Sequence, residues 1–145
     1  MRLAHHTIWI DRPREAVFDF FTDFTQASRW RQYVESMCVV GGGPPRAGSR
    51  VTFTVSIMGE RYTLELEVLA CERPARWRHH SFEPHFSGYV EYLFETEGTG
   101  TRVTFTINTK PKGLYGWLAI PLIYLRREKP YSEQLPNLKR VMEEG

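Results

Sequence analysis

Cysteine is scarce in this chain of 145 residues, and its scarcity excludes two classes of small protein. Cys38 and Cys71 are too few for the disulfide framework of a small secreted domain. They are also too few to supply all the ligands of a structural zinc site. No neighbouring group in the sequence would activate either thiol, so we expect two inert cysteines, buried or half-buried.

A long hydrophobic run is also missing. The longest apolar stretch, residues 113–125, contains Pro121 and is shorter than the roughly 20 residues that a membrane-spanning helix needs. The first residues alternate in polarity and soon reach Asp11 and Pro13, unlike the continuous apolar segment of a signal peptide. We therefore expect a cytoplasmic protein with no integral membrane segment.

Neither sign of charge is in excess. Lys and Arg number 19 against 17 Asp and Glu, for a net charge of +2, whereas nucleic-acid-binding domains usually have a stronger basic bias. We predict no nucleic-acid partner. The hydrophobic and charged fractions, 41% and 25%, are those of a globular protein and exclude a disordered or fibrous chain. The length suits one domain, placed at residues 1–145.

Alternating polarity predicts most of the secondary structure. Residues 2–10 predict a first strand, and turn signals such as Gly41–Pro45 separate the later segments. Each later segment has one apolar face, which is typical of an antiparallel meander with its other face in solvent. These strands are predicted at 51–57, 62–68, 77–81, 88–95 and 103–107.

Helical spacing follows the first strand and returns near the C-terminus. Asp11 is predicted to cap the first helix, with Pro13 in its first turn, and residues 25–32 predict a second short helix. The apolar face of the first helix is predicted to hold Val17, Phe20, Phe21 and Phe24. The C-terminal helix is expected to be kinked or broken at Pro121, Pro130 and Pro136. Its predicted apolar face comprises Leu114, Trp117, Leu118, Pro121, Leu122, Leu125, Leu135, Leu138, Val141 and Met142.

This order of elements carries a resemblance to a known group of proteins. The segments that carry it are 10–13, 17–18, 21–24, 48–51, 98–104 and 138–140. Together they resemble the START-like superfamily, also called Bet v 1-like or polyketide cyclase/dehydrase-like (SRPBCC). The resemblance implies an α+β helix-grip fold: a curved antiparallel sheet of about six to seven strands wrapped on a long C-terminal helix, with two short helices after the first strand.

The resemblance also implies a deep apolar cavity between sheet and helix. Members bind lipids, sterols, quinones, plant hormones or polyketides, and a minority are cyclases, aromatases or hydrolases. Aromatic residues, 14% of this chain, can line such a cavity or fill it as a solid core, and Gly88 and Gly116 are expected to leave room. The predicted pocket residues are Trp30, Phe53, Tyr62, Trp77, His79, Ser81, Tyr92, Phe94, Phe105, Trp117 and Pro121.

His79 is the one catalytic candidate in the sequence. It shares a predicted strand face with Trp77 and Ser81, and an inward histidine can act as a general acid or base, or orient a ligand carbonyl together with Tyr62 and Tyr92. The alternatives are a hydrogen-bonded core histidine, or a strand in the opposite register.

No metal or cofactor is predicted. Adjacent strand residues point to opposite faces, so neither His5–His6 nor His79–His80 can chelate one ion. Glu91, Glu95 and Glu97 are expected on the solvated face of the sheet. Two groups of cations remain: Arg73, Arg76 and Arg78, and then Arg126, Arg127 and Lys129 beside the apolar stretch. The second group favours either an exposed helix end or contact with an anionic membrane surface.

Three functions follow from these features. The first is binding of a small, largely apolar lipid, polyketide or aromatic ligand, oriented by polar groups. The second is a polyketide cyclase or aromatase that uses the same cavity, so enzymatic activity is left open. The third is a peripheral membrane or protein-interaction module that uses Phe82, Tyr89 and Leu93 on the outer face. The chain is expected to be a monomer or a homodimer.

Overall fold

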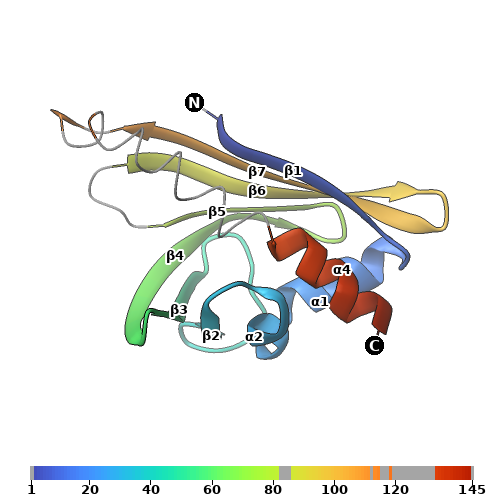
Figure 1. The fold of residues 1–145 in the computed structure, drawn as a ribbon, viewed down its shortest axis with the longest axis horizontal. Helices are drawn as coiled ribbons and strands as arrows, with labels where there is room; N and C mark the ends of the chain where they lie inside the picture. Colours follow the sequence, from blue (N-terminus) through green and yellow to red (C-terminus); the bar gives the residue numbers. More distant parts are fainter. Residues whose placement is uncertain (1, 82–85, 112, 115–117, 119–132, 145) are drawn as a thin grey trace.

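The computed structural model describes residues 2–81, 86–111, 113–114, 118 and 133–144. These residues form a curved seven-stranded antiparallel sheet with helices on one face (Figure 1). The architecture is the helix-grip fold, which confirms the α+β prediction. The strand order is β1-β7-β6-β5-β4-β3-β2, so every strand lies beside its sequence neighbour except β1, which pairs with β7.

The first part of the chain contains β1 (Arg2–Ile10), α1 (Arg14–Thr22), the 3-10 turn η1 (Phe24–Gln26) and α2 (Ala27–Trp30). The remaining elements are β2 (Val34–Val39), β3 (Arg50–Ile57), β4 (Glu60–Glu72), β5 (Arg76–Ser81), β6 (Phe86–Glu97), β7 (Gly100–Pro111) and α4 (Gln134–Glu144). The five later predicted strands correspond to β3–β7. The strand that the sequence prediction lacked is β2.

Alternation along the strands gives the sheet an apolar inner face, which α1 and α4 cover (Figure 1). Between its buried residues lie polar side chains that face outward, as the period of two predicts. The buried inner-face residues are Ala4, Ile10, Val51, Val55, Leu66, Val68, Trp77, His79, Tyr92, Phe94, Val103, Phe105 and Ile107.

The space between α1 and the sheet is filled by aromatic rings. Phe21 lies at their centre, with ring centroids 4.5 Å from Tyr92, 5.2 Å from Phe94 and 5.6 Å from Trp77. Trp30 lies 5.5 Å away on the other side. These edge-on and tilted contacts are the arrangements that aromatic rings prefer. Part of the aromatic surplus is therefore solid core, and the predicted pocket residue Phe94 belongs to it.

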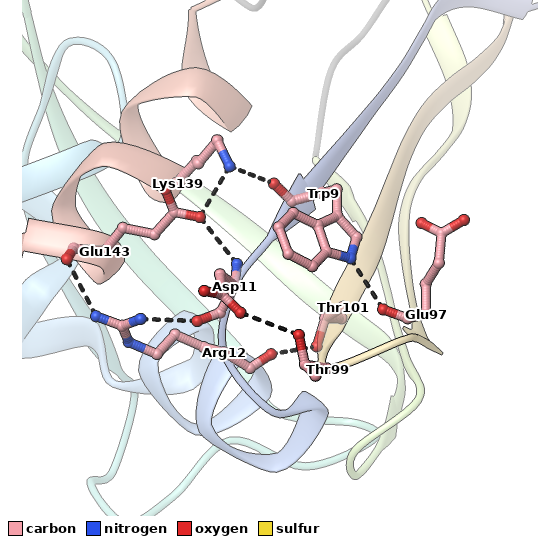
Figure 2. A network of polar contacts seen from close by, with 8 residues as sticks. All are labelled: Trp9, Asp11, Arg12, Glu97, Thr99, Thr101, Lys139 and Glu143. Carbon is pink, nitrogen blue, oxygen red and sulfur yellow. Dashed lines mark hydrogen bonds and ion pairs between the residues drawn. The ribbon is translucent and has the colours of Figure 1, made fainter.

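The start of α1 differs from the prediction. Pro13 occupies the N-cap position, and no side chain caps the helix. Asp11 instead receives a hydrogen bond from Thr99 Oγ1 at its Oδ1, and its backbone N–H donates to Glu143 Oε2 of α4 at 2.8 Å (Figure 2). Asp11 thus joins β1, the β6–β7 turn and α4.

The C-terminal end of α4 is fixed to the sheet by the same network. Lys139 Nζ donates to the backbone oxygen of Trp9 at 2.7 Å and to Glu143 Oε2 at 2.8 Å (Figure 2). Arg12 Nη2 donates to the backbone oxygen of Glu143 at 3.0 Å. We call Trp9, Asp11, Arg12, Lys139 and Glu143 the α4 anchor. It sets where the other end of α4, at Gln134, meets the sheet.

Several predictions for the C-terminal helix need correction. Leu114 and Leu118, expected in the core, are 72% and 65% exposed. Pro136 neither kinks nor breaks α4, because it lies in the first turn, where a backbone N–H has no partner within the helix. The rest of the predicted apolar stretch, including Trp117, Pro121, Leu122, Leu125 and Pro130, lies outside the described residues, as do Arg126, Arg127 and Lys129.

Two smaller expectations are also corrected. Gly88 does not make room for a ligand, because a Cβ there would lie 2.1 Å from the backbone oxygen of Asn108. Its φ of +143° and this close approach of β6 and β7 both require glycine. Cys38, expected to be buried or half-buried, is exposed, while Cys71 is half-buried and its burial raises the pKa of the thiol. Gly116 is outside the described residues.

On the outer face, the predicted cations and carboxylates pair with one another. Glu91 accepts hydrogen bonds from Arg76 at 3.1 Å and Arg78 at 2.6 Å. Near α1, Arg73 forms a two-pronged ion pair with Asp19 that lowers the pKa of the carboxyl. The first cation group is thus neutralised within the molecule.

Among the described residues, no helix is long and apolar enough to cross a membrane.

Candidate functional site

Strand β5 places Trp77 and His79 on the inner face, two residues apart and therefore on the same side. The indole Nε1–H of Trp77 donates to Nδ1 of His79 at 2.8 Å. An indole N–H can only donate, so Nδ1 accepts and the proton of the neutral imidazole lies on Nε2. Within the described residues, no group is hydrogen-bonded to Nε2.

Burial keeps this histidine neutral. His79 is 8% exposed, and burial, with the nearby Arg31 charge and then His80, lowers its pKa to about 3. At neutral pH the side chain therefore presents an N–H donor at Nε2. It can polarise a carbonyl or stabilise an oxyanion, but Nε2 has no lone pair with which to act as a base.

Tyr92 and Gln134 connect the sheet to α4. Tyr92 lies on β6 directly opposite Trp77, and its hydroxyl donates to Gln134 Oε1 at 2.9 Å. Both residues are buried, at 2% and 7% exposure. The first residue of α4 therefore contacts the polar part of the inner face.

Arg31, like Gln134, is absent from the predicted pocket residues. It follows α2 and is only 7% exposed. Its guanidinium lies over the rings of Trp30 and Phe21, 4.3 and 4.7 Å from their centroids. Burial lowers its pKa to about 10, offset in part by Tyr92, so it stays charged at neutral pH. Arginine is rarely buried, and the only sequence signal was its position beside Trp30 at the end of a short helix.

We call Arg31, His79, Tyr92 and Gln134 the inner polar cluster. They come from the end of α2 and from β5, β6 and α4. The charge of Arg31 affects the ionisation of His79, and Tyr92 affects that of Arg31. The cluster borders the packed rings of Phe21, Trp30 and Trp77. It is thus a polar region set into an otherwise apolar face.

Beside the cluster, β1 adds a second inward histidine. The His6 ring stacks on Phe105, with centroids 6.1 Å apart, and its buried Nε2 has no hydrogen-bond partner in the part of the chain that the structure describes. His5 points to the other face, where its Nδ1 contacts Thr106 Oγ1, so the pair cannot chelate an ion. No group of three potential metal ligands occurs in the described parts of the chain.

The predicted pocket residues separate into five groups. Trp30, Trp77, His79, Tyr92 and Phe105 lie in or against the inner polar cluster. Phe53 and Ser81 are half-buried, and Phe94 is core. Tyr62 is a correction: it lies near the β3–β4 turn, is 47% exposed and donates its hydroxyl hydrogen bond to Glu60, so it is not a handle at the cluster. Trp117 and Pro121 lie outside the described residues.

Of the three residues predicted to act on the outer face, two lie within the described residues. Tyr89 is half-buried, with the Arg78 guanidinium 3.9 Å above its ring centroid, and Leu93 is half-buried as well. Phe82 lies outside the described residues.

Comparison with known families decides the classification. The family model described as "Polyketide cyclase / dehydrase and lipid transport" matches residues 1–143. The chain belongs to this family. The resemblance to the START-like, or Bet v 1-like, superfamily is thereby confirmed.

Solved structures share the fold of this polyketide cyclase/dehydrase and lipid transport family member. A protein from Thermus thermophilus, TTHA0849, is 24% identical with a TM-score of 0.72, over 94% of each chain. The ginseng (Panax ginseng) major latex-like protein 151 is 16% identical with a TM-score of 0.62, over 90% of this chain and 95% of that one. A START superfamily protein from Mycobacterium smegmatis is 14% identical with a TM-score of 0.60, over 91% and 97%. No curated protein sequence matches this chain.

Family and fold together indicate a ligand-binding or polyketide cyclase-like protein of the START/Bet v 1 type. Ligand binding and cyclisation require different groups on the inner face of the sheet. Binding needs apolar surface and a few oriented polar groups, whereas cyclisation also needs a group that accepts a proton.

Proposed function

We propose that this protein binds a small, largely apolar molecule against the inner face of the sheet, beside α4. The observation that carries the proposal is the inner polar cluster itself. Buried polar groups in proteins normally satisfy one another, yet the buried Nε–H of Arg31 has no hydrogen-bond partner within the described residues. The hydrogen bond described for the His79 ring is at Nδ1, which leaves its Nε2–H as a second donor. Two such donors beside aromatic rings suit the oxygen of an apolar ligand.

The driving force for binding is burial of the ligand's apolar surface, at roughly 25 cal/mol per Å². The polar groups then fix its orientation. The neutral His79 donates to a carbonyl or hydroxyl oxygen, and the Trp77 indole keeps the imidazole in the tautomer that can do so.

Native mass spectrometry and a neutral dye test the proposal. Protein purified without added ligand should carry a bound mass that is lost on denaturation, and N-phenyl-1-naphthylamine should bind saturably with increased fluorescence. Absence of both a bound mass and dye binding would contradict the proposal.

A matched pair of variants places the site. Ser81→Trp adds bulk to the half-buried inner face next to His79, and should weaken dye binding about tenfold or more. His80→Trp adds the same bulk to the opposite face and should leave the dye affinity within about twofold. Thermal denaturation of both variants verifies that each is folded. Equal effects of the two variants would place the dye elsewhere.

A second candidate is cyclase chemistry on a polyketide-like chain bound in the same place. Arg31 and His79 are two donors that can stabilise the enolate oxygen formed during ring closure. Tyr92, however, already donates to Gln134, and His79 presents N–H rather than a lone pair. Cyclisation of a polyketide thioester that is abolished in His79→Ala would support this candidate, and product formation unchanged in that variant would reject the role of His79.

A further inference from the structure

Arg31 holds a buried positive charge that has no counter-charge among the described residues. It is 7% exposed, and no ion pair within the described residues involves it. The described ion pairs use other arginines, Lys139 and His80, at positions that are more exposed. Burial of a charge costs folding free energy unless the charge is paired and hydrogen-bonded. The burial of the Arg31 guanidinium under the sheet therefore calls for an explanation.

Within the described residues, aromatic rings contact the faces of the Arg31 guanidinium, while its edge makes one long hydrogen bond. The rings of Trp30 and Phe21 take up the flat surface of the guanidinium, with centroids at 4.3 and 4.7 Å. Along the edge, the one described hydrogen bond runs from Nη2 to the backbone oxygen of Phe21, at a long 3.5 Å. The buried Nε–H has no partner. A planar cation stacked on aromatic rings with free N–H groups is oriented to receive a planar anion.

The other members of the inner polar cluster, all within the described residues, are neutral. His79 is uncharged at neutral pH because of its burial, and the cluster's other members, Tyr92 and Gln134, carry no charge there. The cation is thus left unbalanced within the inner polar cluster. An incoming anion would meet one positive charge together with the neutral N–H donor of His79.

We propose that Arg31 binds a carboxylate of the ligand, so that the molecule held at the inner face is an apolar carboxylic acid in its ionised form. The inference rests on the proposed binding function and specifies its ligand class. It makes Arg31 a specificity-determining residue: the apolar part of the ligand lies along the inner face, and its carboxylate ends at the guanidinium edge.

The test compares carboxylates with neutral amides of the same shape. Decanoate against decanamide, and 2-naphthoate against 2-naphthamide, are titrated as competitors of N-phenyl-1-naphthylamine near neutral pH. Charge-assisted hydrogen bonds are the stronger ones, so wild-type protein should bind at least one carboxylate about tenfold more tightly than its amide. A wild-type protein that prefers neither carboxylate overturns the inference.

Variants test whether Arg31 causes the preference for carboxylates. Arg31→Met should reduce the carboxylate preference, measured as the ratio of carboxylate to amide affinity in that variant, to about one. Arg31→Lys keeps the charge, loses the planar fork and should retain only part of the preference. The control is Arg29→Met, an exposed arginine in α2, two residues before Arg31, which should keep the full preference. A preference that survives in Arg31→Met overturns the inference.

The failure of the inference and that of the proposed function can be told apart. Dye binding without any carboxylate preference leaves the binding function intact and removes the role of Arg31. Wild-type protein that carries no bound mass and binds no dye removes both. Thermal denaturation controls for folding: Arg31→Met leaves no unpaired buried charge, so its Tm should equal or exceed that of the wild type. A lowered Tm together with an unchanged carboxylate preference identifies Arg31 as a purely structural cation and overturns the inference.

Discussion

At His79, the position of one proton depends on a residue two places earlier in the same strand. The Trp77 indole donates to Nδ1, which leaves the proton on Nε2 and directs it away from Trp77. Replacing that indole should therefore change the chemistry of the imidazole without changing its position on β5.

In Trp77→Phe, the imidazole of His79 is expected to lose its fixed tautomer. Without the indole donor, Nδ1 can also carry the proton, so the two neutral tautomers should mix. Long-range ¹H–¹⁵N spectra distinguish them through the imidazole nitrogen shifts. Trp30→Phe is the control, because that indole Nε1 is buried but has no hydrogen-bond partner. An unchanged His79 spectrum in Trp77→Phe would contradict the assigned tautomer.

His79 should also make folding stability depend on pH. Its folded-state pKa, lowered to about 3, lies below the ordinary value of 6.5. Between these values the unfolded chain binds a proton that the folded chain does not, so stability falls as pH drops from about 6.5 toward about 3. The slope approaches about 1.4 kcal/mol per pH unit for one proton. Urea denaturation should show this component in the wild type and not in His79→Gln; equal slopes would contradict it.

The helix α4 depends on its anchor. Glu143 accepts hydrogen bonds from Lys139 and from the Asp11 amide, and these lower the pKa of its carboxyl. Because the folded-state pKa is below the unfolded one, the stabilisation is present above the ordinary glutamate range and is lost as pH falls through the folded-state pKa. The anchor thus couples the position of Gln134, at the far end of α4, to the charge of Glu143.

Glu143→Gln is therefore expected to lower the Tm by a few degrees at neutral pH, and the difference from wild type should shrink in acid. Glu144→Gln is the matched control. It removes the next carboxylate along α4, whose ion pair with Arg140 is exposed and 3.6 Å long. Thermal denaturation of both variants across pH checks this, and equal losses of Tm would show that the anchor adds no stability.

How well each helix or strand could be predicted depends on the polarity pattern of its sequence. Strands β3–β7 alternate strongly, so the sequence predicted both their existence and their faces. In β2 the polar Glu35 and Ser36 adjoin each other, and the strand ends beside a glycine run, so no clear period appears. Asp11 has the composition of a cap, but tertiary contacts with Glu143 and Thr99 determine its actual role.

Across the whole molecule, Phe21 joins α1 and α2 to the centre of the sheet. It is 1% exposed and contacts four aromatic rings. Phe21→Ala should cost about 3–5 kcal/mol of unfolding free energy. Phe20→Ala, next to it on α1 but only partly buried, should cost much less. Urea denaturation measures both, and similar losses would contradict a core centred on Phe21.

The candidate site was predictable only where burial follows a pattern. Alternation along β5 and β6 placed Trp77, His79 and Tyr92 on the inner face. Arg31 and Gln134 were not predictable, because polar residues in short helices or at helix starts are usually exposed and no period marks a buried one. Tyr62 is the opposite case. Alternation along β4 predicted the face of the sheet on which Tyr62 lies, but it could not predict that this part of β4 lies beyond the helices that cover the sheet.

Pairing of β1 with β7 has a consequence for how the chain acquires its structure. Strands β2 to β6 each pair with the strand that follows them in the sequence, whereas His5 of β1 meets Thr106 of β7, 101 positions later. Closing so large a loop carries an entropic cost that contacts between adjacent strands avoid. During synthesis on the ribosome, the first strand therefore waits unpaired while the meander assembles, and its addition completes the sheet.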